Sequence, residues 1–348
     1  MADTMKSVYW TGENKIELLD DIPVPEVLPG TVKVKMAYGA LCATDFHQVS
    51  MGVMNARFTQ PRPMGHEGSG IIVEMGEATE KSGLKVGDRV AVFPGGSCGI
   101  CDLCKRGLPG CRNPVRGGGG ATFSQYNVIP AGGAYKIPDD APSIMPYAIA
   151  EPLGCILRCM DLQPIYNGDS VLVSGVGAIG SIMLDMVIKS GAVKVTVSDP
   201  VPEKRALALS MGAQYVIDPM NEDLVARGRE LTDGRGYNKI YEVSGVPVTV
   251  QPCLDLVSRA GTATFFAVFP PTYEHKINLH TLYMKEAAIQ FVFTHPNCAP
   301  RAVDLIPRMQ TDKIIGKVYD LADAMEAIDM FEKSIYPKIL LKCNEDLE

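Results

Sequence analysis

The sequence predicts an α/β protein in which a doubly wound parallel Rossmann domain is joined to a mostly β domain. Three observations support this prediction. The middle of the chain alternates short apolar runs with helical periodicity, a glycine-rich turn follows the first of these runs, and the first 150 residues are short β-rich runs broken by Gly and Pro. At 348 residues the chain has room for two domains, because a single core stops growing near ~250–300 residues.

The middle region begins with the apolar run "SVLVS" at 170–174, which leads through "GVGAIG" into a helical pattern. The apolar residues of that pattern fall on one helix face: Ile179, Ile182, Met183, Met186 and Val187. Further strands are predicted at 193–198, 214–218, 238–244 and 262–268, and helices at 202–211, 222–232 and 247–259. Short connections between strand and helix imply right-handed crossovers and a parallel sheet covered on both faces. Residues 152–288 are therefore predicted to form a nucleotide-binding domain.

The two ends of the chain read differently. Runs such as "TVKVKMAYGA", "GSGIIVEMG", "DRVAVFP" and "FSQYNVIP" predict a compact, mostly antiparallel β domain over 1–151. Residues 289–348 hold a helical "LADAMEAIDMFEKS" and a strand "KILLK". This segment is too short for a domain, so we expect it to return to the first one.

Composition excludes several classes of protein. The net charge of −7 argues against nucleic acid as a partner, because such a surface needs a basic stripe. The most apolar window, "VLVSGVGAIGSIMLDMVIKSGAV", is interrupted by Asp185 and Lys189, so no membrane span is predicted. The start "MADTMKSVYW" lacks the pattern of a secretory signal, which predicts a cytoplasmic protein. Ten cysteines in a reducing compartment should not form disulfides, so clustered ones indicate metal.

One such cluster is "SCGICDLCKRGLPGC", which holds Cys98, Cys101, Cys104 and Cys111 in an irregular Gly- and Pro-rich loop. Four thiolates can enclose a tetrahedral Zn²⁺ and leave no position open for substrate, so a structural zinc is predicted. An iron–sulfur cluster and unrelated buried thiols are the alternatives.

A catalytic zinc needs three protein ligands and a vacancy. The candidates are Cys42 in "GALCATDFH", His66 and Glu67 in "PMGHEGSG", and Glu151 in "IAEPLG". Each also has a simpler interpretation: Cys42 as a core thiol, His66 as a turn residue and Glu151 as the acid of a helix N-terminus. The spacing alone leaves these alternatives open.

The turn "GVGAIG" has G-x-G-x-x-G spacing between a strand and a helix, the context a dinucleotide site requires. Its residues predicted to bind the cofactor are Gly175, Gly177, Ala178, Ile179 and Gly180, with the pyrophosphate at the helix N-terminus. Asp199 ends the next strand, 19 residues after Gly180. A carboxylate there can accept both ribose hydroxyls and would repel a 2′-phosphate, which favours NAD over NADP. Asp199 as a helix N-cap is the alternative.

The ordered pattern "GALCATDFH…PMGHEGSGIIVEMG…KVGDRVAVFP…CGICDLCKRGLPGC…EPLG…VLVSGVGAIG…SD…EVSG" resembles the zinc-dependent medium-chain alcohol dehydrogenase family over essentially the whole chain. It is most similar to the sorbitol (polyol) and threonine dehydrogenase branch. The resemblance implies that 1–151 is a GroES-like catalytic domain and that Cys42 and His66 bind catalytic zinc. Glu151 is the choice of the polyol branch, and Glu67 either binds the metal or exchanges with water and Glu151. The last spacer of the cysteine loop has six residues, where the family usually has seven.

The resemblance gives roles to further residues. Thr44 and His47 become a proton relay that includes the cofactor ribose, and Asp45 is expected to support a neighbouring backbone or the site. Lys204 becomes a contact to the ribose, while Arg205 beside it keeps NADP open. Val268, expected to end the "FFAV" strand, would lie near the nicotinamide, or simply in the core of the sheet.

Together these residues predict a zinc-dependent oxidoreductase with one catalytic and one structural zinc. It would transfer hydride between a secondary alcohol, polyol or sugar-derived, and NAD, giving the ketone. An amino-alcohol such as L-threonine and a sugar-alcohol phosphate are alternative substrates. A redox-inactive nucleotide-binding relative and a zinc-free NADPH reductase are alternatives of another class. By resemblance we expect a homodimer or homotetramer.

Overall fold

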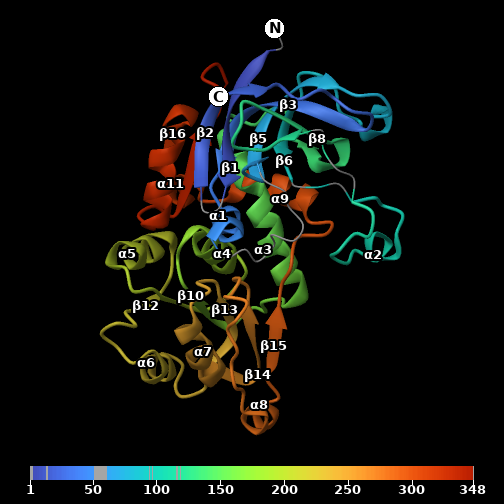
Figure 1. Cartoon of the computed structure of the whole chain (residues 1–348). Coiled ribbons are helices and arrows are strands. Elements are labelled where there is room, and N and C mark those ends of the chain that lie inside the picture. Colours follow the sequence, from blue (N-terminus) through green and yellow to red (C-terminus); the bar gives the residue numbers. More distant parts are fainter. Residues whose placement is uncertain are drawn as a thin grey trace. The chain divides into compact units, whose positions relative to one another are not determined.

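The computed structural model describes residues 3–12, 15–50, 61–93, 95, 97–114, 117 and 119–347, without the side chains of residues 48 and 50. The chain divides into two compact units, and Figure 1 labels most of their helices and strands. The first unit comprises Met1–Gly154, His295–Thr311 and Ile315–Glu348, and the second comprises Cys155–Thr294 and Asp312–Ile314.

The second unit is built on a six-stranded sheet in which every pair of neighbours is parallel. Its order is β12 (Tyr215–Ile217), β11 (Lys194–Ser198), β10 (Ser170–Ser174), β13 (Tyr237–Glu242), β14 (Val257–Phe265) and β15 (Ala288–Phe291). The helices are α4 (Ala178–Ile188), α5 (Pro202–Met211), α6 (Leu224–Leu231), α7 (Val250–Leu256) and α8 (Leu279–Lys285), with α3 (Ala150–Leu162) leading in from the first unit. From the first strand, β10, the chain adds β11 and β12 on one side and then returns to add β13, β14 and β15 on the other side. This strand order is that of a doubly wound nucleotide-binding fold. The predicted Rossmann fold is confirmed.

The boundary between α7 and β14 differs from the prediction. We expected a helix over 247–259 and a strand over 262–268. Instead a 3₁₀ turn (Pro247–Thr249) precedes α7, and β14 starts at Val257 and ends at Phe265. Leu256 and Val257 are both buried, so the apolar pattern runs unbroken from helix into strand and does not reveal the change of backbone conformation.

The first unit contains two sheets. The larger has the order β16 (Ile315–Asp320), β17 (Lys338–Lys342), β3 (Thr31–Ala40), β5 (Glu67–Met75), β6 (Arg89–Val92) and β9 (Ala134–Lys136), with β8 (Tyr126–Pro130) paired to β3 and β7 (Gly119–Gly120). The smaller has the order β2 (Lys15–Pro23), β1 (Thr4–Gly12) and β4 (Arg62–Pro63). Their pairs are antiparallel except β16 with β17.

Short helices connect these strands. They are α1 (Ala43–Ser50), α2 (Asp102–Lys105), α9 (Ala299–Leu305), α10 (Thr311–Ile314) and α11 (Ala324–Glu332), with 3₁₀ turns at Glu80–Ser82, Ala131–Gly133, Met145–Ile149, Ile306–Arg308 and Leu321–Asp323. No helix in the described ranges is both long and apolar enough to cross a membrane.

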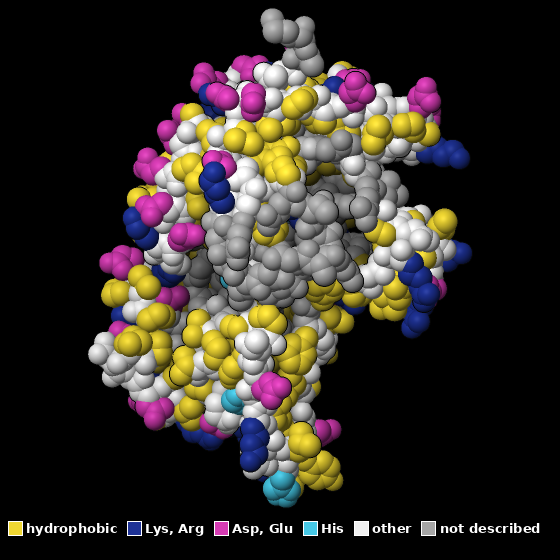
Figure 2. All heavy atoms as spheres, viewed as in Figure 1, with side chains coloured by type: hydrophobic (Ala, Val, Ile, Leu, Met, Phe, Trp, Pro, Cys, Tyr) yellow, Lys and Arg dark blue, Asp and Glu magenta, His cyan; other side chains and the backbone are white. Residues whose placement is uncertain are grey.

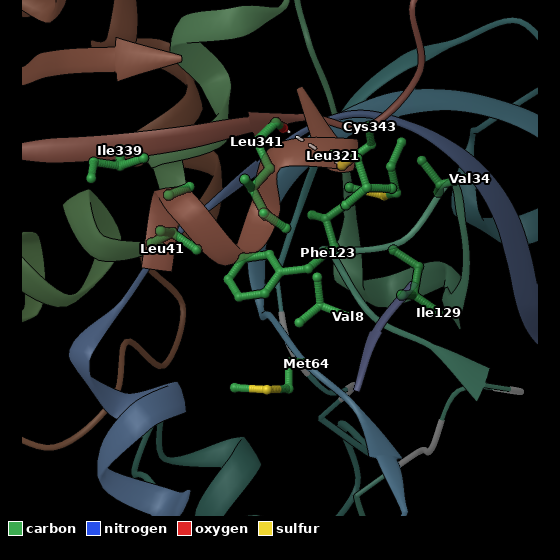
Figure 3. Packing of buried hydrophobic residues seen from close by; sticks show 14 of the residues in the cluster. Val8, Val34, Leu41, Met64, Phe123, Ile129, Leu321, Ile339, Leu341 and Cys343 are labelled. Atoms are coloured by element: carbon green, nitrogen blue, oxygen red, sulfur yellow. Dashed lines mark hydrogen bonds between the residues drawn. The ribbon is translucent and has the colours of Figure 1, made fainter. Parts of the chain in front are cut away.

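The core of the first unit joins segments from both ends of the chain. Phe123 is fully buried and lies among Val8, Met64 and Leu341 in Figure 3. The C-terminal strand β17 pairs with β3, with Leu340 opposite Ala40. The last strand of the chain therefore completes the sheet that the first third begins.

Candidate metal and cofactor sites

The register of β3 and β5 brings three candidate ligands together. Cys42 follows β3 closely, His66 precedes β5, and Glu67 begins β5 directly opposite Ala40. One ligand atom from each of these three side chains lies within 4.8 Å of the others. A thiol, an imidazole and a carboxylate thus converge from segments more than twenty residues apart in sequence.

The orientation of His66 is fixed by Asp45 on α1. The His66 Nδ1 atom lies 3.0 Å from Asp45 Oδ1, and that oxygen also accepts a hydrogen bond of 3.3 Å from the backbone N–H of Gly65. This contact leaves Nε2 free to face Cys42 and Glu67, with 4.0 Å between Nε2 and Glu67 Oε1. Burial alone would lower the pKa of His66, but the negative charges of Asp45 and Cys42 outweigh it and raise the pKa well above its ordinary value. A carboxylate behind a ligating histidine commonly sets its ring orientation and basicity.

Glu67 has a buried cationic partner, Lys338, at the start of β17. The Nζ atom lies 2.5 Å from Glu67 Oε2, and both side chains are completely inaccessible to solvent. Among the described residues neither Glu67 oxygen has a hydrogen-bond partner, so Oε2 is held by the ion pair with Lys338 and Oε1 by no polar side chain at hydrogen-bonding geometry. Burial raises the pKa of Glu67, although Lys338 opposes the shift. Lys338 was not predicted from the sequence, where its only signal was a lysine at the head of an apolar strand.

Glu151, at the start of α3, has a partner of its own. The Nε2 atom of His295 lies 3.0 Å from Glu151 Oε1. Burial would raise the pKa of Glu151, but the hydrogen bond from His295 lowers it overall. The negative charge of Glu151 in turn raises the pKa of Glu67. Glu151 itself belongs to a different group of possible ligand atoms from Cys42, His66 and Glu67. His295 was not predicted either, because nothing in the sequence around this loop histidine marks it.

These residues fit a catalytic zinc. Such a site takes three protein ligands from Cys, His and Asp or Glu and keeps one position for water or substrate. Cys42, His66 and Glu67 supply that donor set, and a buried carboxylate oxygen without a hydrogen-bond partner is the atom a metal would satisfy. The alternative of His66 as a hydrogen-bonded turn residue is compatible with its contact to Asp45, but it gives no reason for Cys42 and Glu67 to converge on the same ring.

The four loop thiols also converge. One sulfur each from Cys98, Cys101, Cys104 and Cys111 lies within 4.8 Å of the others. Cys101 caps α2, where its sulfur accepts a 3.5 Å hydrogen bond from the Cys104 backbone N–H. Bonds from backbone N–H groups lower the pKa of Cys101 to about 6, while the bond with Cys101 raises the pKa of Cys104 to about 11. Four sulfurs at this spacing suit a closed tetrahedral site.

The glycine turn of the second unit fits a pyrophosphate. Gly175 has φ +100°, a conformation that side chains rarely adopt, and a Cβ on Gly180 would lie 2.1 Å from the Gly175 carbonyl oxygen. A Cβ on Gly177 would meet nothing within 4 Å, so the space beside it is open. Gly177 caps α4 without any side-chain hydrogen bond, which leaves the first N–H groups of the helix for an anion.

Asp199 follows β11 and supports the same turn. Its Oδ2 accepts a 2.8 Å hydrogen bond from the Val176 N–H, and its Oδ1 accepts one of 2.9 Å from the Val201 N–H. The N-cap of α5 is Val201, so the alternative of Asp199 as that helix's N-cap was wrong.

The remaining predicted cofactor residues lie on α5 and after β14. Lys204 is buried on α5. Arg205 forms a 2.8 Å ion pair with Asp218 and donates to the Asp199 carbonyl. Val268 lies three residues beyond the end of β14 and is 58% exposed, so the expectation that it ends this strand, and the alternative of sheet core, were both wrong.

The predicted relay residues Thr44 and His47 lie on α1, directly after Cys42. Both side chains are partly buried. Burial lowers the pKa of His47, which favours the neutral imidazole that can accept a proton near pH 7.

Family models match both units. Residues 28–139 match the alcohol dehydrogenase GroES-like domain, and residues 178–308 match the zinc-binding dehydrogenase domain. L-threonine 3-dehydrogenase of Pyrococcus furiosus is 35% identical over 275 residues, 78% of each chain. Sorbitol dehydrogenase of Bacillus subtilis is 28% identical over 92% of this chain and 90% of its own.

Solved structures agree. A zinc-binding dehydrogenase from Clostridium scindens is 31% identical, with a TM-score of 0.90 over 97% of this chain and 99% of its own. One from Sinorhizobium meliloti, bound to NADP, is 29% identical with a TM-score of 0.87, over 98% and 99%. An alcohol dehydrogenase from Escherichia coli, complexed with NADH, is 26% identical with a TM-score of 0.86, over 97% and 99%.

These matches define an oxidoreductase with a GroES-like domain and a nucleotide-binding domain. The chain belongs to the zinc-dependent medium-chain alcohol dehydrogenase family.

Proposed function

We propose that this enzyme uses a catalytic zinc and NAD to oxidise a secondary alcohol, polyol or sugar-derived, to the ketone. The observation that carries the proposal is the convergence of Cys42, His66 and Glu67 within 4.8 Å. Bound zinc supplies a Lewis acid that lowers the pKa of a coordinated alcohol, and the nicotinamide supplies the hydride acceptor.

The residues of the chain would divide the remaining work. Asp45 holds the His66 ring so that Nε2 faces the metal position. Thr44 would accept the proton of the alcohol while donating its own hydroxyl proton to the cofactor ribose. The ribose would pass a proton to His47 and so to water, for which a neutral imidazole is the suitable outer member.

We assign Glu67 rather than Glu151 as the resting third ligand. Neither Glu67 oxygen has a hydrogen-bond partner among the described residues, and Lys338 forms its ion pair with Oε2, so Oε1 is the oxygen left for a metal. Glu151 Oε1 is instead engaged by His295. We also propose a structural zinc in the four-cysteine loop, giving about two zinc ions per chain.

We propose NAD as the cofactor, in contact with Gly175, Gly177, Ala178, Ile179, Gly180, Asp199, Lys204 and Val268. Asp199 would repel a 2′-phosphate, and Arg205, the residue that could favour one, is paired with Asp218. Fluorescence titration of NADH and NADPH measures the preference. Tighter binding of NADPH would refute it.

The polyol assignment follows from the two carboxylates near the metal position, an anionic environment that suits polyhydroxylated ligands in the resembling family. L-threonine is the second candidate, because a relative named L-threonine 3-dehydrogenase is 35% identical. A sugar-alcohol phosphate is the third. Screening polyols, hydroxy amino acids and sugar-alcohol phosphates for reduction of NAD or NADP separates these candidates. A zinc-loaded protein inactive on all three classes would favour a redox-inactive relative.

We further propose a homodimer or homotetramer in the cytoplasm. Hydrophobic side chains are exposed on and beside α8 and edge strand β15 (Figure 2): Leu279 (76%), Tyr283 (81%), Phe291 (67%) and Phe293 (64%). A second copy would cover such a patch. Light scattering gives the oligomeric state.

A further inference from the structure

His295 makes a buried contact that the proposed function has not yet used. Its Nε2 lies 3.0 Å from Glu151 Oε1, with the two side chains only 17% and 9% exposed. His295 lies in the loop between β15 and α9, more than 140 residues after Glu151. The contact therefore depends on the tertiary fold.

The surrounding structure holds the imidazole ring in place. The ring packs edge to face against Phe93, with 5.2 Å between ring centroids and an interplanar angle of 70°. A Cβ on Gly154 would lie 3.4 Å from His295 Cβ, at van der Waals contact, so the loop packs directly against the start of α3. The His295 carbonyl accepts a 3.1 Å hydrogen bond from the Cys298 N–H, which fixes the backbone.

Two of the other three ligand candidates, His66 and Glu67, have comparable partners. Asp45 contacts the ring nitrogen of His66, and Lys338 contacts one oxygen of Glu67. His295 stands in the same relation to Glu151. Partners of this kind fix the orientation of a metal-site side chain, and their loss typically costs about 10–100-fold in activity or metal affinity.

We propose that His295 is a positioning residue that holds the Glu151 carboxylate in one orientation beside the Cys42–His66–Glu67 cluster. The inference rests on the proposed function, since it assumes a metal in that cluster. Without a donor at residue 295, Glu151 rotates and changes the surroundings of the metal.

Two non-donor variants and one donor variant separate hydrogen bonding from packing. His295→Phe keeps an aromatic ring against Phe93 but cannot donate to Glu151, and His295→Ala removes both. His295→Gln keeps an N–H donor without the ring. Phe93→Leu is the matched packing control, because it removes the edge-to-face contact and keeps the hydrogen bond.

The experiment uses the holoenzyme with Co²⁺ in place of zinc and reads its visible absorption spectrum together with kcat/KM. We expect His295→Phe and His295→Ala to shift the cobalt bands and to lower kcat/KM by about 10–100-fold. His295→Gln and Phe93→Leu should leave the bands in place. In a Glu151→Gln background, His295→Phe should change kcat/KM by less than about twofold, because residues acting as one unit are not additive.

Three outcomes would overturn the inference. The inference fails if the cobalt absorption bands are unchanged in a folded His295→Phe or His295→Ala variant. It also fails if His295→Phe lowers kcat/KM as much in the Glu151→Gln background as in the wild type. A wild-type enzyme that binds no cobalt at Cys42 and His66 would overturn the proposed function together with it. Bands present in the wild type but unaffected by residue 295 would overturn the inference alone.

Discussion

The two metal-site candidates of the first unit are built in opposite ways. The cysteine loop takes all four ligands from residues 98–111, and its partly exposed thiols are tuned by backbone N–H groups of the same loop. The Cys42–His66–Glu67 cluster draws on separate segments, and its partners Asp45 and Lys338 come from a helix and from the last strand.

This difference separates a local property from a tertiary one. A short loop can enclose a metal because its own spacing supplies the geometry. An open site must hold buried charges with a vacancy between them, and buried charges need partners that only the assembled sheet supplies.

The largest effect is expected for Cys42→Ser. Loss of a zinc ligand should lower kcat by about 10³-fold or more, because the metal contributes several kcal/mol to charge stabilisation. Metal analysis should show zinc falling from about two ions per chain to about one, with the fold retained in circular dichroism. A variant that oxidises alcohols at the full rate would refute the catalytic assignment.

Lys338→Met should lower the free energy of unfolding by about 3–5 kcal/mol, because it leaves the fully buried Glu67 carboxylate unpaired. Urea denaturation measures this change. Adding Glu67→Gln should recover part of this loss. Lys333→Met is the matched control: its ion pair with Asp329 is more than half exposed on both sides, so the cost should stay below about 1 kcal/mol. Equal costs for the two lysines would contradict the assignment of Lys338.

Cys104→Ser in the loop should remove the other zinc and leave kcat within about twofold at 25 °C, since a closed site touches no substrate. We expect the Tm to fall by about 3–8 °C, the equivalent of about 2 kcal/mol. Calorimetry measures the Tm and metal analysis the zinc content, each compared with the values for Cys42→Ser. A loss of activity as large as that of Cys42→Ser would break the distinction between the two sites.

In the metal-free loop, Cys101 should be the first thiol that iodoacetamide alkylates. With a pKa of about 6, the Cys101 thiol is almost fully ionised to the reactive thiolate well above pH 6 and becomes protonated as the pH falls through 6. The Cys104 thiol, with a pKa of about 11, stays protonated at pH 7. Mass spectrometry of chelator-treated protein gives the rate at each residue. Equal alkylation rates at Cys101 and Cys104 would refute the difference between their pKa values. Added zinc should protect both thiols from alkylation.

The smallest effect is expected for Arg112→Ala. The ion pair of Arg112 with Asp102 spans 2.9 Å, but the side chains are 66% and 54% exposed. Its loss should change the unfolding free energy by less than about 1 kcal/mol and leave zinc content unaltered. A loss of zinc would show that the loop depends on surface charge as well as on its thiols.

Much of the fold could be predicted from the sequence because it is encoded at short range. The parallel sheet followed from alternating periodicity and the Gly175–Gly180 turn, and the KILLK strand was placed at its observed bounds. The end of α7 was misplaced because Leu256 and Val257 are both core residues, and Val268 was misplaced because β14 ends before it.

By itself the sequence determined the glycine turn, the cysteine spacing and the types of residue able to bind a metal, because spacing over a few residues fixes each of them. Only the tertiary structure decided that Lys338 pairs with Glu67 and His295 with Glu151. The reason is that burial and tertiary packing, including the register that sets Ala40 opposite Glu67, bring together charges that lie more than 140 residues apart in sequence.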